Sequence, residues 1–224
     1  TGSERPSAGS WTEKSNGVYV STLTLGSAAG QLSVMPRVNG QNAVAQPLVL
    51  NVAGDASKAE IRDMTVKVNN QLANGQSANQ ITLTVVDSYG NPLQGQNVTL
   101  TLPKGVTSKT GNTVTTNAAG KADIELISTV AGELEIAAAV KNSQKTVTVK
   151  FNADASTGQA NLQVDTAVQK VANGKDAFTL TATVEDKNGN PVPGSLVTFN
   201  LPRGVKPLTG DNVWVKAKDE GNAE

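Results

Sequence analysis

The sequence predicts an all-β protein built from tandem β-sandwiches that stack into an elongated rod. Three observations lead to this prediction: polar and apolar residues alternate as in strands, turn-forming clusters separate the alternating stretches, and a repeat recurs with a period of 99 residues. No stretch shows a convincing helical stripe, and the segment 70–79 is too rich in asparagine, glycine and glutamine to hold a helix.

Period-two alternation identifies the strands, because successive side chains of a strand point to opposite faces. The pattern occurs in five stretches of the central region: 80–85, 97–102, 121–126, 133–136 and 146–151. Clusters of glycine, proline and asparagine lie between the stretches and set turns. This register predicts Thr99 on the outward face and an inward series formed by Leu83, Val98, Leu100, Ile124, Ile136 and Val149.

The repeat gives the size of one sandwich. Residues 73–112 align without a gap on residues 172–211, and 20 of these 40 positions are identical. A period near 100 residues with about seven strands fits one immunoglobulin-like sandwich. Inward positions exchange one apolar residue for another, as with Leu100 and Phe199, whereas Val86 and its counterpart Glu185 are expected on the outward face.

The repeat also predicts the domain boundaries, because Asp55-Ala56-Ser57 recurs 99 residues later as Asp154-Ala155-Ser156. We expect residues 1–60 to form the C-terminal part of a preceding Ig-like domain, 61–159 a complete one, and 160–224 the N-terminal part of a further one. The linkers are short and contain no glycine-serine tract, which predicts restricted bending between tandem immunoglobulin-like β-sandwiches.

Composition excludes most site chemistry. Lysine plus arginine equals aspartate plus glutamate at 19 each, so no net field attracts nucleic acid. Cysteine and histidine are both absent, which removes thiolate nucleophiles, imidazole bases and the usual zinc ligands. We therefore expect no catalytic residue, cofactor or metal site. An enzyme would need a carboxylate pair, yet Asp123, Glu125 and Glu133 are expected on outward strand faces, away from any apolar pocket.

Two residues of the repeated loops remain as site candidates in the sequence. Asp87 and Asp186 either bind calcium beside loop carbonyls, since hard cations take oxygen ligands, or end a strand and accept backbone hydrogen bonds in a turn. The second interpretation is favoured, because no D-x-D-x-D-G spacing surrounds either residue. Tyr89 is the best candidate for an exposed aromatic platform that contacts a ligand.

The repeated unit resembles a known module. The residues that carry the resemblance are A-N-G-x-x-A, T-x-T-V-x-D-x-x-G-N-P-x-x-G-x-x-V-T-x-x-L-P-x-G-V, T-G and N-A-A-G-K-A. They look like the group 1 bacterial immunoglobulin-like domain, which occurs in tandem in the intimin and invasin family of outer-membrane adhesins. The resemblance covers nearly all of 66–160 and the first two thirds of a further copy from 162.

The resemblance implies a cell-adhesion and virulence role at the bacterial cell surface. It suggests an extracellular stalk that hangs from an outer-membrane β-barrel outside this chain and holds an adhesive region towards a host-cell surface or extracellular-matrix protein. The alternative is that these Ig-like domains themselves bind a host protein or glycan. Neither the barrel nor the C-type-lectin-like tip of the family is recognisable in the sequence.

The two ends of the chain are expected to carry incomplete sandwiches. Residues 1–60 would hold late strands and residues 162–224 early strands, so Leu180, Val184, Val197, Phe199 and Leu201 would form an uncovered apolar face. We expect the chain to be part of a longer one, or its end units to self-associate by strand addition.

Overall fold

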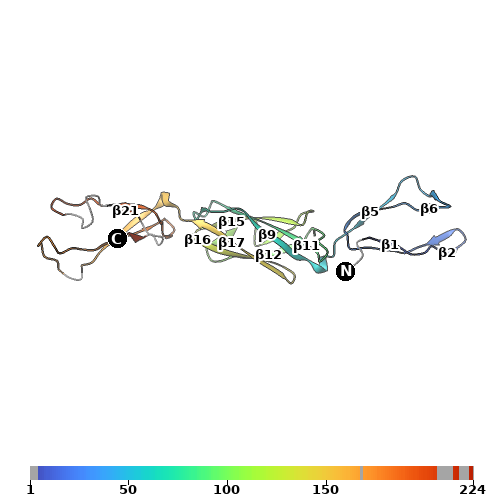
Figure 1. Ribbon diagram of the computed structural model, residues 1–224, viewed down its shortest axis with the longest axis horizontal. Coiled ribbons are helices and arrows are strands. Elements are labelled where there is room, and N and C mark those ends of the chain that lie inside the picture. The colour runs from blue at the N-terminus through green and yellow to red at the C-terminus, as the bar shows by residue number, and fades with distance from the viewer. Residues whose placement is uncertain (1–4, 167–168, 206–213, 217–221, 224) are drawn as a thin grey trace.

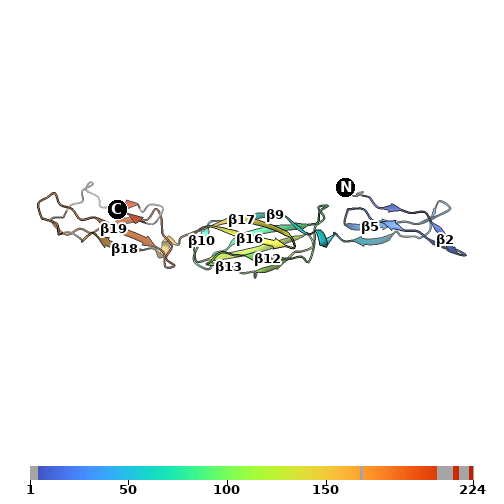
Figure 2. The same ribbon diagram turned by 90° about the horizontal axis from the view of Figure 1, so that it is seen from below.

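The computed structural model describes residues 5–166, 169–205, 214–216 and 222–223. In these ranges the only helical pieces are two single 3-10 turns, η1 (Ala56–Lys58) and η2 (Ala155–Thr157). The strands form three groups that follow one another along one axis, and a view turned by 90° keeps the same elongated outline (Figures 1 and 2). The described part of the chain is therefore a rod, and it contains no helix of the length and apolar character needed to cross a membrane.

The middle group of strands, called here the middle unit (59–152), is a β-sandwich. One sheet has the order β13-β15-β11-β9 and the other the order β10-β17-β16-β12-β14. The strands are β9 (Glu60–Val68), β10 (Gln71–Leu72), β11 (Asn79–Val86), β12 (Asn97–Thr101), β13 (Val106–Ser108), β14 (Thr113–Thr115), β15 (Lys121–Ser128), β16 (Gly132–Val140) and β17 (Ser143–Asn152).

The start of the middle unit passes from one sheet to the other. β9 pairs antiparallel with β11, whereas β10 pairs parallel with β17. Between them Asn70 has a φ of +61°, a left-handed conformation that asparagine tolerates. The buried Asn79 side chain holds the crossing in place, because its Nδ2 donates to the Lys150 carbonyl at 2.9 Å and its Oδ1 accepts from the Gln71 amide at 3.2 Å.

The core of the middle unit confirms the predicted register. The inward series is buried in a single apolar cluster to which Phe151 also belongs, and Thr99 is exposed. The five predicted stretches are β11, β12, β15, β16 and β17. One outward assignment is wrong: Val86 is buried, since it is paired with Glu60 of β9 on one side and bridged to Pro92 on the other.

Four strands of the middle unit escape the pattern analysis. β13 and β14 have three residues each and β10 has two, which is too short for a recognisable alternation. β9 is long, but Ile61 is its only fully buried residue, so the apolar period is weak. A strand at the edge of a sheet buries less, and its sequence carries correspondingly less signal.

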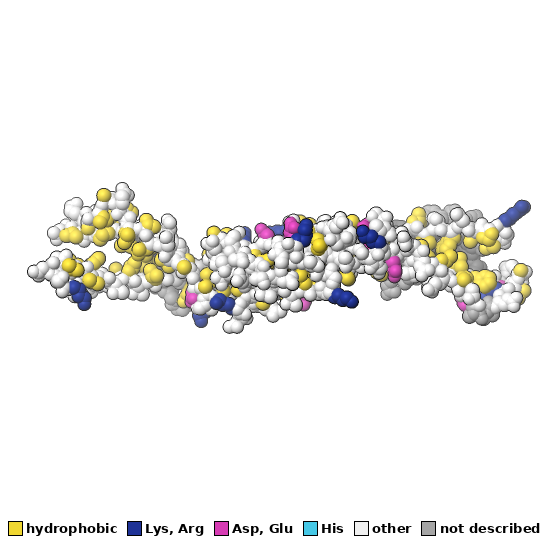
Figure 3. All heavy atoms as spheres, turned by 180° about the vertical axis from the view of Figure 1, so that it is seen from behind, with side chains coloured by type: hydrophobic (Ala, Val, Ile, Leu, Met, Phe, Trp, Pro, Cys, Tyr) yellow, Lys and Arg dark blue, Asp and Glu magenta, His cyan; other side chains and the backbone are white. Residues whose placement is uncertain are grey.

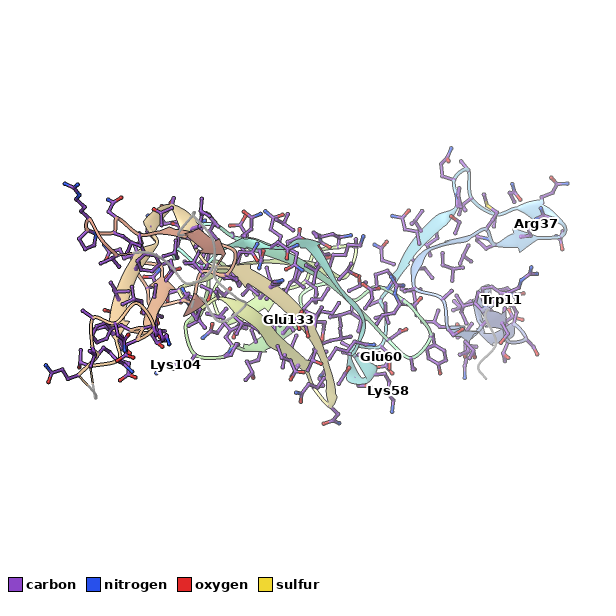
Figure 4. The ribbon with its side chains drawn as sticks, turned by 60° about the vertical axis from the view of Figure 1, so that its left-hand side comes forward. Trp11, Arg37, Lys58, Glu60, Lys104 and Glu133 are labelled. Carbon is purple, nitrogen blue, oxygen red and sulfur yellow. The ribbon has the colours of Figure 1, made fainter. Side chains whose placement is uncertain are left out.

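The N-terminal group, called the N-terminal unit (5–52), forms two arms. One arm contains β1 (Ser7–Ala8), β2 (Thr12–Ser15), β3 (Val18–Val20) and β4 (Leu23–Thr24); the other contains β5 (Gly30–Val34), β6 (Arg37–Val38), β7 (Gln41–Asn42) and β8 (Leu48–Val52). Figure 4 shows Trp11 on one arm and Arg37 on the other. The β5–β8 pair begins with Gly30 opposite Val52, as the β16–β17 pair begins with Gly132 opposite Phe151.

The C-terminal group, called the C-terminal unit (159–205, 214–216 and 222–223), repeats early strands of the middle unit. It contains β18 (Gln159–Val164), β19 (Leu180–Glu185), β20 (Leu196–Thr198), β21 (Trp214–Lys216) and β22 (Asn222–Ala223), in sheets β18-β19-β22 and β20-β21. A small core lies near the middle unit and consists of Ala182, Val184, Val192 and Val197, with Ala153 and Phe199 packed against it.

This small core corrects the predicted uncovered face. Val184 and Val197 are buried in this core with Phe199 packed against them, and Leu180, Phe199 and Leu201 are half-buried. The exposed apolar side chains lie elsewhere in the unit, at Leu162, Val164, Val171, Phe178, Leu196 and Val205. In Figure 3 hydrophobic side chains are prominent on both end units, whereas the visible face of the middle unit is mainly polar or backbone.

Candidate functional site

The repeated loop after β11 is a tight, internally bonded structure. Oδ1 of Asp87 accepts the backbone amides of Tyr89 and Asn91, both at 2.9 Å. The Asp87 amide donates to the Asn91 carbonyl at 3.0 Å, and Gly90 takes a φ of +88°, which glycine adopts without strain. The loop therefore presents the Asp87 and Asn91 side chains in one orientation at the end of the sandwich.

These two side chains hold the preceding unit. Asn91 Nδ2 donates to the Ser27 carbonyl at 2.7 Å, and Asn91 Oδ1 accepts the Ala29 amide at 2.8 Å. Oδ2 of Asp87 accepts the Asp55 amide of the linker at 2.9 Å. We call the Asp87–Asn91 pair the first clasp, and the contact region between the N-terminal and middle units the first joint.

The same arrangement recurs at the second joint, between the middle and C-terminal units. Asn190 Nδ2 donates to the Thr129 carbonyl at 2.9 Å, and its Oδ1 accepts the Ala131 amide at 2.8 Å. Oδ2 of Asp186 accepts the Asp154 amide at 3.0 Å. The Asp186–Asn190 pair is thus a second clasp, and Asn188 adds a hydrogen bond from its Nδ2 to the Ala73 carbonyl at 2.9 Å.

Each linker is short and capped. Oδ1 of Asp55 accepts from the Ser57 amide at 3.0 Å and from its hydroxyl at 2.6 Å, and Asp154 and Ser156 repeat these contacts. An aspartate in this position satisfies amides at the start of the 3-10 turn that no helical carbonyl reaches. Lys58 and Glu60 project from the chain just after the first linker (Figure 4). The linker backbone is therefore ordered on both sides of the joint.

The hydrogen bonds of each clasp favour the ionised aspartate. Burial acts to raise the pKa of Asp87, but donors from the Asn91 side chain and from the Asp55, Asn91 and Tyr89 amides outweigh burial and hold the pKa below its ordinary value. The pKa of Asp186 is lowered in the same way, against burial, by Asn190, Asp154 and Asn188. A carboxylate that accepts several N–H donors binds them more strongly when charged.

The two interpretations of the loop aspartates can now be compared. Both oxygens of Asp87 point to N–H donors, and such donors occupy the positions a coordinated cation would need. Among the described residues, no three acidic side chains gather as a metal site would require. The geometry matches an aspartate that ends a strand and accepts backbone hydrogen bonds, with the further feature that one donor comes from the linker.

Tyr89 lies in the first clasp loop, and the residue is 57% exposed. Its counterpart in the second loop is Asn188, which reaches back to the middle unit. Of the other aromatic residues, Phe151 is buried and Phe199 half-buried, while Trp11, Tyr19 and Phe178 are exposed. The Trp214 side chain lies outside the described residues.

Sequence reasoning missed the partners of the clasp. Asn91 and Asn190 stand in the G-N-P motif of each copy, and Asp55 and Asp154 stand in the D-A-S motif, so their identity was visible as repetition. Their role was not, because each bond joins residues about 30 or 60 positions apart.

A family model decides the classification. The model of the bacterial Ig-like domain (group 1) matches residues 61–152 and 159–224. The chain belongs to this family. Its middle unit and C-terminal unit are therefore bacterial Ig-like domain sequence, and the second clasp is a contact between successive Ig-like units.

Relatives of the chain include adhesins. The inverse autotransporter adhesin YeeJ of Escherichia coli K12 is 30% identical over 194 residues, which are 85% of this chain and 8% of that protein. The chain thus spans a small part of this curated relative. The solved structure of the Escherichia coli adhesin FdeC has a TM-score of 0.62 at 24% identity, over 94% of this chain and 71% of FdeC. InvD of Yersinia pseudotuberculosis has a TM-score of 0.63 at 18% identity, over 100% of this chain and 71% of InvD. These two structures show the same all-β Ig-like fold.

Proposed function

We propose that the chain is a segment of the extracellular stalk of a bacterial surface adhesin, which holds an adhesive region away from the outer membrane for host-cell attachment. The observation that carries this proposal is the repeated clasp. Two successive joints use the same residue types at a period of 99 residues and bond to equivalent backbone atoms. Units joined in one geometry extend along one axis, as a stalk requires (Figure 1).

The family and the relatives support a proposal for the domain organisation, the location and the partner of this stalk. On this proposal residues 61–159 form a complete Ig-like domain, and residues 1–60 and 160–224 belong to its neighbours. The chain lies at the bacterial cell surface, and its parent protein is anchored in the outer membrane through a region outside this chain. The partner is a host-cell surface or extracellular-matrix protein, which the parent adhesin contacts.

Small-angle scattering of the whole chain tests the stalk. We expect an extended particle with one narrow distribution of dimensions, because short linkers and bonded joints restrict bending. A compact particle, or a broad ensemble of bent shapes, would contradict the proposal. The Asn91→Ala and Asn190→Ala variants serve as the matched comparison, since each should broaden the distribution.

A second candidate function is ligand binding by the Ig-like units themselves. Tyr89 favours it, because this aromatic ring stays exposed where the second clasp has a joint-forming asparagine. Binding of the isolated chain to host cells and to a glycan panel would distinguish the two functions. Loss of binding in Tyr89→Ala but not in Tyr19→Ala would favour the ligand site, and the stalk alone predicts no binding by any of these proteins.

We propose no enzymatic activity for the chain. Asp123 and Glu133 are exposed and Glu125 is half-buried on the outer face of the middle unit, away from its apolar core. Hydrolase assays on glycan and peptide panels should show no turnover, and turnover that Asp123→Asn or Glu125→Gln abolishes would overturn this statement.

β18 is the strand on which self-association of the isolated chain can be tested. All six residues of this strand are exposed, and β18 lies at the edge of its sheet, with Leu162 and Val164 in solvent. We propose that a second copy adds a strand there. Light scattering should show a mass that rises with concentration, and Leu162→Lys should keep the chain monomeric. A wild-type mass that stays monomeric at every concentration would contradict this proposal.

A further inference from the structure

The two sides of each joint contribute different kinds of atoms. In the clasp bonds the following unit contributes side chains, and the preceding unit and linker contribute backbone atoms. These backbone atoms are Ser27 O, Ala29 N and Asp55 N at the first joint, and Thr129 O, Ala131 N and Asp154 N at the second. At the second joint the Thr157 hydroxyl of the linker also accepts the Lys187 amide at 3.2 Å.

The lengths of the clasp bonds differ by no more than 0.2 Å between the two joints, although the preceding turns differ in sequence. The turn reads G-S-A-A-G at 26–30 and S-T-V-A-G at 128–132. The bond to the alanine amide is 2.8 Å long at both joints. The bond to the serine or threonine carbonyl is 2.7 Å at the first joint and 2.9 Å at the second, and the bond from the linker aspartate amide is 2.9 and 3.0 Å. Every residue other than proline offers the same backbone donor and acceptor. The clasp therefore accepts different turn sequences without a change in geometry.

The shared requirement in the preceding unit is a backbone conformation. Gly30 and Gly132 follow the bonded alanine at φ values of +130° and +121°, and an added Cβ would meet nothing within 4 Å at either position. Glycine is needed there for its backbone angle and not for space.

At each joint, the fit between one linker residue and one residue of the following unit does depend on size. A Cβ added to Gly54 would lie 2.8 Å from Leu93 Cδ2 and 3.2 Å from both Asn91 Cβ and Asp87 Oδ2. The equivalent residue of the second joint is Ala153, which packs against the small core that contains Val192, the counterpart of Leu93. The second joint thus has one carbon more at the linker and one carbon less on the facing side chain.

We propose that the clasp end of each unit is a docking surface for the backbone of a preceding Ig-like unit, and that its selectivity lies in the size match of this one pair. The partner is a preceding unit that presents an Ala-Gly turn and an extended linker at the joint. A linker with glycine before its aspartate fits a following unit that has leucine after the loop proline, as with Gly54 and Leu93. A linker with alanine at that position fits a following unit that has valine there, as with Ala153 and Val192. This inference deepens the proposed stalk, because it states which units can follow one another.

A double-mutant cycle at the first joint tests the size match in the full-length chain. Gly54→Ala should lower the hydrogen-exchange protection of the Asp55 and Ala29 amides by about tenfold or more, because the methyl group overpacks against Leu93. Adding Leu93→Val should restore protection to within about threefold of the wild-type chain, since this double variant copies the second joint. Additive losses, or no loss in Gly54→Ala, would overturn the size match.

The reciprocal cycle at the second joint leaves the core of the middle unit untouched. Val192→Leu should lower the hydrogen-exchange protection of the Asp154 and Ala131 amides, and adding Ala153→Gly should restore this protection. Should Leu93→Val itself unfold the middle unit, this cycle still decides the matter by the same criterion of additivity. The control for backbone readout is Ser27→Thr with Ala28→Val, which copies the other turn and should change protection less than about twofold. A larger loss there would overturn the backbone part of the inference.

The cycles also separate this inference from the stalk proposal. If Asn91→Ala and Asn190→Ala leave the scattering of the chain unchanged, the joints do not determine its shape and the stalk loses its support. If these variants loosen the rod while both size cycles are additive, the stalk stands and the size match is wrong.

Discussion

Asp186 and Asn190 hold each other at the second joint. Oδ1 of Asp186 accepts the Asn190 backbone amide at 2.9 Å, and its two oxygens accept the Asn190 side-chain amide at 3.1 and 2.9 Å. Asn190 is buried, and its orientation determines whether it reaches the Thr129 carbonyl and the Ala131 amide of the middle unit. Both protons and the oxygen of this side-chain amide are therefore used.

The graded loss of cross-joint bonds is the first prediction. Asn190→Ala removes two bonds to the middle unit and should weaken the second joint by about 1–3 kcal/mol, because buried partners lose their hydrogen bonds. Asn188→Ala removes the single bond to Ala73 and should cost about 1 kcal/mol or less. Hydrogen exchange at the Asp154 amide, which bonds to Asp186 in both variants, measures the difference, and equal effects would contradict the assigned roles.

Acid should open the joints. The pKa values of Asp87 and Asp186 are lowered in the folded chain, so their contribution is complete above the ordinary aspartate pKa of about 4 and is lost as the pH falls through the lowered values. Scattering should be constant between pH 7 and about 5 and should broaden below about 4. Asp87→Asn combined with Asp186→Asn should remove this pH dependence.

Asp63 provides the control for the acid experiment. Burial of its carboxylate acts to raise its pKa, but contacts with Arg62, Thr84 and Lys121 outweigh burial and lower it, so Asp63 also adds acid sensitivity. Asp63 lies within β9 and its carboxylate bonds to Arg62 and Thr84, neither of which belongs to a clasp, so Asp63→Asn should leave the pH profile of the joints unchanged. If Asp63→Asn instead removes the change of scattering with pH, this result would contradict the explanation of acid opening by the clasps.

The register of the sandwich predicts unequal costs at adjacent residues. Leu100 is buried opposite Ala138 of β16, and its truncation to alanine should cost about 2–5 kcal/mol through lost transfer energy and a cavity. Thr99→Ala, on the exposed face, should cost well under about 1 kcal/mol. Denaturant titration measures both, and similar losses would show that the strand faces are reversed.

Comparing Gly120 with Gly95 distinguishes a steric clash from backbone strain as the reason why glycine is needed. They have φ values of +71° and +72°, but a Cβ on Gly120 would lie 2.5 Å from the Val85 carbonyl oxygen, whereas one on Gly95 would meet nothing within 4 Å. Gly95→Ala should cost roughly 1 kcal/mol, and Gly120→Ala should cost clearly more. Calorimetry of the two variants tests this, and equal melting temperatures would rule out the close contact.

The sequence by itself determined five strands of the middle unit, their register and the repeat. Alternation of polar and apolar residues is a local signal, so β11, β12, β15, β16 and β17 could be predicted, and so could the burial of Leu83 and Ile124. β9 could not, because a strand that buries little carries little periodic signal. Val86 was misassigned because the pairing that covers it comes from Glu60 and Pro92, which the alternation of β11 does not reveal.

Only the tertiary structure decided what the repeated loop is for. The G-N-P and D-A-S motifs were visible as identical copies, but a copy does not say what its side chains touch. Asn91 meets Ser27, and Asn190 meets Thr129, about 60 residues back along the chain and in the preceding unit. The partners are backbone atoms, which every residue carries, and therefore no pattern of side chains in the sequence could have named them.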